Sequence, residues 1–168
     1  SDWALLRHET LTWEARGRVR LAHGLRSGDR IEVSGARAFY DQKTQKGRLL
    51  PAPGAAIEFR RTPVDGEPDQ GVAAQLDWVG QDLVRLSGTV HVWGPRLELW
   101  GGQAEYGAAP GALTLTQDRP VLRLLERDWS GAVQADVITA LRTPERLLAE
   151  GRTRGWIRFK EKLEELAR

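Results

Sequence analysis

The feature that most constrains the fold is a series of short segments in which apolar and polar residues alternate, each bounded by glycine or proline. The clearest are Thr89–Trp93, Arg96–Trp100 and Ala112–Thr116. Successive side chains of a β-strand point to opposite faces of the sheet, so a period of two indicates strands with one buried face. Helical spacing is confined to residues 159–168, which are predicted to form a short amphipathic C-terminal helix. The rest of the chain is predicted to be all-β.

The alternating segments recur as an ordered unit. Gly35–Tyr40 returns as Gly101–Tyr106, so that Tyr40 and Tyr106 hold matching places. Strands in tandem with short turns pair with their neighbours, which predicts an antiparallel meander within one domain, residues 1–168. A stretch rich in Pro, Gly and Asp between the first two units is interpreted as a loop. The units are placed at about 11–61, 76–125 and, as a partial copy, 132–159, with the loop at 62–75.

The composition excludes several classes of protein. The 25 basic and 23 acidic residues are interspersed, so no block is typical of a polyanion-binding tail. The absence of cysteine excludes disulfides, thiolate chemistry and cysteine-ligated metal. No run approaches the roughly 18 apolar residues that a transmembrane helix needs. Because Ser1 comes first and methionine is absent, we expect that an N-terminal signal or anchor has been removed.

The sequence offers no residues with the spacing of a catalytic or metal site. His8, His23 and His91 lie in different segments, and none is spaced with a carboxylate as in a metal or catalytic pair. A phosphate-binding glycine loop, a Gly-x-Ser-x-Gly elbow and a His-Glu-x-x-His motif are all missing. We therefore predict a protein that is not an enzyme and that needs no cofactor or metal.

A family resemblance is carried by Gly35–Asp41, the following Gln42–Thr44, and the shorter copy Ala104–Tyr106. Here the chain resembles the OstA/LptA-like repeat of periplasmic lipopolysaccharide-transport proteins, the type of LptA, LptC and the N-terminal domain of LptD. The resemblance implies an antiparallel β-jellyroll open along one side, often described as a β-taco. It implies a periplasmic, non-enzymatic protein that binds and transfers lipopolysaccharide or a related glycolipid in outer-membrane biogenesis.

The resemblance also implies partners. Members of this family join edge to edge, so other Lpt-type proteins or a second copy of the chain are expected to pair with its edge strands. The predicted C-terminal helix would block such pairing if it covered the terminal strand.

The apolar slot implied by the resemblance is assigned to the inward face of the alternating strands. Two such faces that meet without closing tightly leave a cleft suited to an acyl chain. For any single one of these residues, an ordinary sandwich core is the commoner role. The predicted slot residues are Ile31, Val33, Tyr40, Ile57, Phe59, Leu86, Val90, Val92, Leu97, Leu99, Tyr106, Leu113, Leu115 and Phe159.

The tryptophans leave a second function open. Trp93, Trp100, Trp129 and Trp156 lie in or beside predicted strands with arginine nearby. Aromatic rings that stack bases, beside guanidinium groups that follow phosphates, are typical of single-stranded nucleic-acid binding. Against this reading, the alternation puts acidic residues on the same outward faces, where they repel a phosphate backbone; they are Glu32, Glu58, Glu98 and Glu105. A purely structural envelope or adhesion module is the third possibility.

Overall fold

The computed structural model describes residues 3–25, 27–80, 82–107, 111–142 and 145–160, and these form strands and turns without a helix. Accordingly, the described residues include no helix long and apolar enough to cross a membrane. All strand pairs are antiparallel within one continuous sheet. The strands are β1 (Trp3–Arg7), β2 (Thr12–Gly24), β3 (Arg30–Asp41), β4 (Lys46–Leu50), β5 (Ile57–Thr62), β6 (Asp69–Ala73), β7 (Gln75–Val79), β8 (Leu83–Trp93), β9 (Leu97–Gly107), β10 (Ala112–Thr116), β11 (Val121–Leu125), β12 (Trp129–Gln134), β13 (Val137–Arg142), β14 (Glu145–Glu150) and β15 (Arg154–Phe159).

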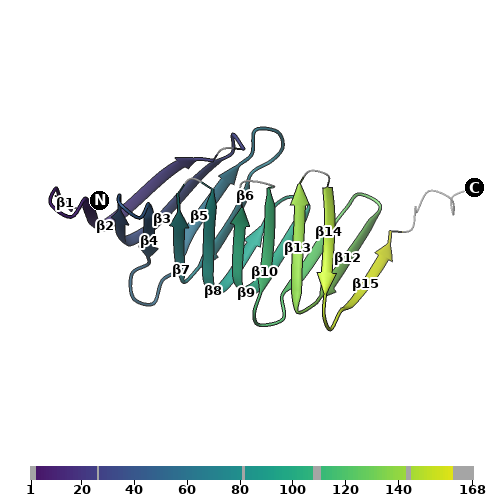
Figure 1. The fold of residues 1–168 in the computed structure, drawn as a ribbon. Helices are drawn as coiled ribbons and strands as arrows, with labels where there is room; N and C mark the ends of the chain where they lie inside the picture. The colour runs from purple at the N-terminus through teal and green to yellow at the C-terminus, as the bar shows by residue number, and fades with distance from the viewer. Residues whose placement is uncertain (1–2, 26, 81, 108–110, 143–144, 161–168) are drawn as a thin grey trace, which may run out of the picture.

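The sheet folds into two walls that share four long strands. In Figure 1 the strands stand side by side along the molecule, with the chain running from β1 at one end to β15 at the other. The first wall contains β1, β4, β7, β10, β13 and β14, together with one half of each of β2, β3, β8 and β9. The other halves of these long strands belong to the second wall, with β5, β6, β11, β12 and β15.

The fold line between the walls is marked by breaks in the strand register. The pairing of β2 with β3 shifts between Arg16 and Val19, and that of β8 with β9 shifts between Ser87 and Val90. Gly88 has a φ of +71°, which an L side chain rarely adopts. Its carbonyl and that of Ser87 both accept the N–H of Ala74, at 2.9 and 3.1 Å. Bulges of this kind bend a strand and increase its twist, and here they turn four strands from one wall into the other.

The sequence repeat corresponds to a structural one. The second half of β3 pairs with β4 and its first half with β5, while β9 pairs in the same way with β10 and β11. Gly35 lies opposite Val19, and Gly101 lies opposite Val90. Tyr40 and Tyr106 therefore occupy equivalent places, both on the inner face of the first wall.

The core lies along the fold line, between the inner faces of the walls. Apolar residues at alternate positions point inward, as the strand period requires. Burying each of the largest apolar side chains contributes roughly 1.5–3 kcal/mol to the stability of the fold, relative to leaving that side chain exposed. The fully buried leucines and isoleucines are Leu49, Ile57, Leu99, Leu115, Leu122 and Ile138.

The outer face of the first wall is covered by ion pairs between neighbouring strands. Arg37 Nε lies 2.7 Å from Glu14 Oε1, and Arg48 Nε lies 2.6 Å from Asp77 Oδ1. Arg85 Nη2 lies 2.7 Å from Glu105 Oε2. Each exposed pair contributes little to stability, but together they give this wall a polar face in which the charges satisfy one another.

Two sequence-based expectations are corrected by the fold. The interpretation of 62–75 as a loop is wrong over Asp69–Ala73, because this stretch forms β6 between β5 and β8. Glycine has a low strand propensity, so Gly71 weakened the strand pattern in the sequence. Glycine is nevertheless required at this position, because a Cβ would lie 2.3 Å from the Phe59 ring. The predicted helix cannot start at Phe159, which ends β15. Residues 161–168 of that prediction lie outside the described residues.

Candidate functional site

A slot of about 790 Å³ lies between the two walls. Its floor is apolar and is supplied by both walls, because the alternation in each strand directs one row of side chains inward. Its rim carries charged residues and a proline-containing loop. The apolar side chains of the floor include Leu76, Val84 and Leu86 from the first wall, and Val92, Leu97, Leu99, Leu122 and Leu124 from the second.

The structure places the predicted slot residues in three groups. The first group lines the slot and consists of Ile31, Phe59, Leu86, Val92, Leu97, Leu99, Tyr106 and Leu113. The second group, Ile57, Val90 and Leu115, is almost fully buried beneath the floor. Val33, Tyr40 and Phe159 form the third group and lie elsewhere. The alternation therefore identifies the inward face, but it does not separate lining residues from core residues.

The residues of the third group have different surroundings. Val33 is buried and borders a groove on the second wall. Tyr40 packs between Trp13 and Trp78, with ring centroids 5.8 and 6.0 Å away. Phe159 is the last residue of β15, lies opposite Trp129 and is 75 % exposed.

Several lining residues were not singled out from the sequence. Leu122 and Leu124 alternate within β11, and the same period-two signal identifies them. The charged residues could not be found in this way, because the alternation assigns charged residues to the outward face. Arg61, Asp69 and Arg146 nevertheless line the slot from strands β5, β6 and β14, and the other charged residues come from loops. The lining residues missed include Trp129, Ala140, Leu147, Arg61, Asp65, Glu67, Asp69, Glu126 and Arg146.

A buried polar cluster ties the walls together at the slot. Asp29, in the turn between β2 and β3, is fully buried. Tyr106 Oη, from the first wall, donates to Asp29 Oδ2 at 3.4 Å, and Arg61 Nη1 lies 3.8 Å from the same oxygen. Arg61 also pairs with Asp69. Burial acts to lower the pKa of Arg61, but the charge and hydrogen bond of Asp69, followed by Tyr106 and Asp29, outweigh burial and hold that pKa above its ordinary value.

The β5–β6 loop lies over this end of the slot. The backbone N–H of Val64 donates to Asp29 Oδ1 at 3.2 Å. Gly28, with a φ of +86°, lies so close that a Cβ there would be 2.6 Å from Val64 Cγ2. Pro63, Asp65 and Glu67 from the loop line the slot. Asp29 thus holds both the opposite wall and the covering loop.

No protein-family model matches the sequence, and no curated protein matches it. Among solved structures, the chain is similar to LptH of Pseudomonas aeruginosa, described as the LptA homologous periplasmic component of the conserved lipopolysaccharide transport device. The TM-score is 0.60 at 14 % sequence identity, over 76 % of this chain and 92 % of that one. The fold is that of an LptA-like protein. This confirms the predicted all-β jellyroll, and the low identity limits the comparison to the fold.

Over the described residues, the jellyroll is open at the end formed by β14 and β15. The inner faces of β14 and β15 carry Leu147 and Ile157, which are 40 % and 66 % exposed. Within the described part of the chain, β14 pairs with β13 alone and β15 with β12 alone, so each presents a free edge. At the other end, β1 pairs with β2 and with no other described strand, and it exposes Trp3, Leu5 and Leu6. Free edges beside exposed apolar residues offer backbone groups to a further strand.

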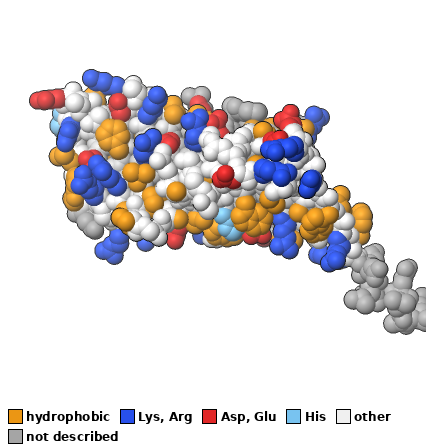
Figure 2. Space-filling view, turned by 90° about the horizontal axis from the view of Figure 1, so that it is seen from below, with side chains coloured by type: hydrophobic (Ala, Val, Ile, Leu, Met, Phe, Trp, Pro, Cys, Tyr) orange, Lys and Arg blue, Asp and Glu red, His pale blue; other side chains and the backbone are white. Residues whose placement is uncertain are grey.

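The tryptophans of the alternative function are divided between the two faces of the second wall. Trp129 lines the slot, whereas Trp93, Trp100 and Trp156 alternate outward. Glu98 lies among them and pairs with His91 and Arg123. Figure 2 shows acidic, basic and hydrophobic side chains interspersed over the face seen from below. The described surface seen there is not the basic track that a phosphate backbone requires.

Proposed function

We propose that this protein binds lipopolysaccharide or a related glycolipid in the periplasm and passes it on without chemical change, with the acyl chains in the slot. The observation that carries the proposal is the slot itself. It has an apolar floor built from both walls, a charged rim and an open C-terminal end. The structural likeness to LptH, a component of a lipopolysaccharide transport device, supports the same function.

The physical chemistry of the slot suits an acyl chain. Burying one methylene group contributes roughly 0.8 kcal/mol, so partial burial of several chains supplies affinity without a specific polar contact. Arg146, Asp65 and Glu67 are exposed at the rim and stay beside water, where a hydrated head group remains. Because the apolar floor extends to Leu147 beside the open end, a bound chain can slide along apolar side chains in that direction. This arrangement supports transfer as well as binding.

Partners of the LptA type, or a second copy of this chain, fit the free edges. A strand added to β14 or β15 continues the sheet and covers the exposed Leu147 and Ile157. The slot then runs on into the neighbouring protein. The first wall ends at β14 and the second at β15, on the same side of the molecule. A single partner that docks there can therefore extend both walls.

Site-specific photocrosslinking tests the proposal. Benzoyl-phenylalanine is introduced at Leu97, Leu113 or Leu124, which line the slot, and at Glu98 or Glu105, which face outward. We expect lipopolysaccharide to crosslink at the three slot positions and not at the outward ones. Equal crosslinking on both faces, or none in the slot, contradicts the proposal. Binding of a single-stranded oligonucleotide in its place would favour the nucleic-acid alternative.

A further inference from the structure

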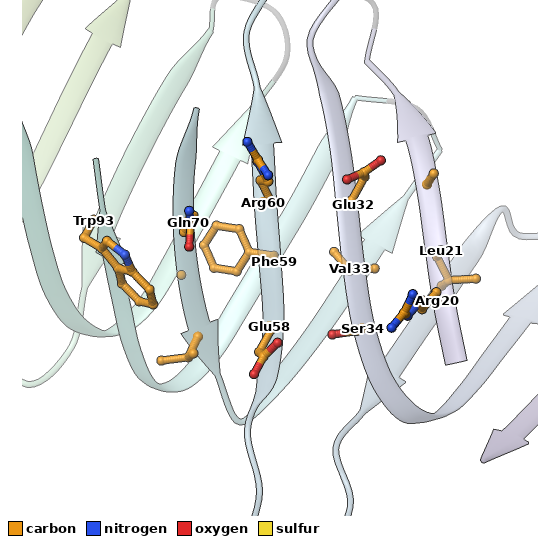
Figure 3. A pocket seen from close by; sticks show the side chains of 13 residues that line it. Arg20, Leu21, Glu32, Val33, Ser34, Glu58, Phe59, Arg60, Gln70 and Trp93 are labelled. Carbon is orange, nitrogen blue, oxygen red and sulfur yellow. The ribbon is translucent and has the colours of Figure 1, made fainter. Parts of the chain in front are cut away.

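A second hollow of about 660 Å³ lies on the outer face of the second wall, away from the slot. It crosses β2, β3, β5, β6 and β8, whose outward side chains line it. Neighbouring strands lie about 4.8 Å apart, so the four steps from β2 to β8 span roughly 19 Å. Figure 3 shows Trp93 at one end of this groove and Arg20 at the other, with Glu58 and Arg60 on β5 between them.

The polar side chains of the groove are left available for a ligand. Arg20, Glu58, Arg60 and Gln70 have no side-chain hydrogen bond or ion pair with another described residue. Arg60 even lies directly opposite Glu32 in the sheet, but Glu32 pairs with Arg30 at 2.9 Å. The outer face of the first wall is different, because there the cross-strand charges satisfy one another.

The aromatic ring at the end of the groove is held in place. Trp93 packs against His91, with ring centroids 4.8 Å apart, and His91 stacks on Trp100 at 5.0 Å and 9°. His91 Nε2 also lies 3.0 Å from Glu98 Oε1, which fixes the imidazole between the two indoles. Because Trp93 also borders the groove, its ring offers a positioned apolar surface there.

We propose that this groove binds a short oligosaccharide. Sugar hydroxyls both donate and accept hydrogen bonds, so they match a surface where carboxylate, guanidinium and amide groups are mixed. The C–H face of a sugar ring can pack on the indole of Trp93. An acyl chain is disfavoured because it would strip water from several charges, and a phosphate backbone is disfavoured because Glu32 and Glu58 repel it. The length of the groove suits several linked sugars.

Titration with saccharides that carry no lipid tests the proposal. The full chain is titrated with the lipid-free core oligosaccharide of lipopolysaccharide and, separately, with a soluble fragment of cell-wall glycan. Calorimetry gives the affinity, and the indole N–H signals in an NMR spectrum show which tryptophans respond. Binding of either saccharide with a shift of the Trp93 signal supports the proposal, and the one that binds identifies the source of the sugar.

Matched variants make the assignment specific. Trp93→Ala removes the stacking surface, and we expect about tenfold weaker saccharide binding or more. Trp156→Ala is the control, because Trp156 also faces outward on the second wall but does not line the groove; binding should be unchanged. Glu58→Gln keeps the shape and removes one charge, so it is informative even if Trp93→Ala fails to fold, and it should weaken binding several-fold.

Three results would overturn the proposal. The first is the absence of saccharide binding at millimolar concentration. The second is binding that neither Trp93→Ala nor Glu58→Gln weakens. The third is binding of a single-stranded oligonucleotide to the groove in place of both saccharides.

Discussion

At the scale of single residues, Asp29 makes the contacts that no strand pattern supplies. It is the one charged side chain among the buried described residues. It joins a turn of the second wall to Tyr106 of the first wall and to the covering loop. A buried carboxylate is costly unless it is hydrogen-bonded and paired, and here Tyr106, Val64 and Arg61 do both. Removing the Asp29 side chain should therefore loosen the covering loop at the slot and lower the stability of the protein.

Replacement of Asp29 by Ala should lower the free energy of unfolding by about 2 to 3 kcal/mol, because Tyr106, Val64 and Arg61 each lose a buried partner. Urea denaturation measures the change. Glu67→Ala, at an exposed position of the β5–β6 loop that Asp29 holds through Val64, is the control and should stay within about 0.5 kcal/mol of the wild type. Equal stability of both variants would mean that the cluster does not hold the walls.

Asp136 gives a prediction about pH. Hydrogen bonds from the side chain and then the backbone of Arg152 hold the pKa of Asp136 below its ordinary value of 3.8. A carboxyl group whose pKa is lowered on folding stabilises the fold above its unfolded value, and this contribution is lost as the pH falls through the folded-state pKa.

Asp136→Asn should therefore be less stable than the wild type at neutral pH, and the gap should narrow as the pH falls below 3.8. Thermal melts over a pH series measure it. Asp128→Asn is the control, since Asp128 is exposed and it is the backbone carbonyl of Asp128 that accepts the N–H of Lys160. A gap that does not change with pH would show that the carboxylate charge is not responsible.

At the scale of elements, β6 shows how a strand can lack a strand-like sequence. Gly71 carries no side chain, and the Phe59 ring of the neighbouring strand occupies the space above it. The backbone of β6 still completes the second wall between β5 and β8. Strand β6 must pack closely against the Phe59 ring of β5, and this packing outweighs the low β propensity of glycine.

Gly71→Ala should destabilise the protein by roughly 1–3 kcal/mol, because the added Cβ would lie 2.3 Å from the Phe59 ring and 2.7 Å from the carbonyl oxygen of His91. Gly24→Ala is a matched control at the end of β2, where a Cβ meets nothing within 4 Å. Chemical denaturation of the two variants compares them. If both substitutions have the same small effect, Phe59 does not pack over β6.

At the scale of the whole molecule, the two walls make a slot rather than a closed sandwich. The inner faces meet along the fold line, where the core is fully buried, and they separate towards the rim. Neighbouring residues of one strand thus face either the slot or the outside. Leu97 and Glu98 form such a pair, since Leu97 lines the slot and Glu98 faces outward.

Leu97→Arg should weaken lipopolysaccharide binding by more than about tenfold, because a charge in the apolar floor must be buried against the acyl chains. Glu98→Gln changes the adjacent residue on the opposite face and should leave binding intact. Displacement of a fluorescent fatty acid measures both. Similar losses in the two variants would place the lipid outside the slot.

The sequence alone determined the all-β class, the repeat and the inward face of most strands. These are local properties, since a strand of period two assigns each residue to a face regardless of what the face meets. It did not separate Leu113, which lines the slot, from Leu115, which is buried beneath it, because both alternate in the same phase.

Only the tertiary structure decided where the slot is and what closes it. Asp29 and Tyr106 stand 77 positions apart, and no periodicity links them. Their contact depends on the bulges that turn β2 and β8 from one wall into the other. The depth of the slot and its open end follow from how two folded sheets separate, which is a property of distant pairings and cannot be read from any single segment.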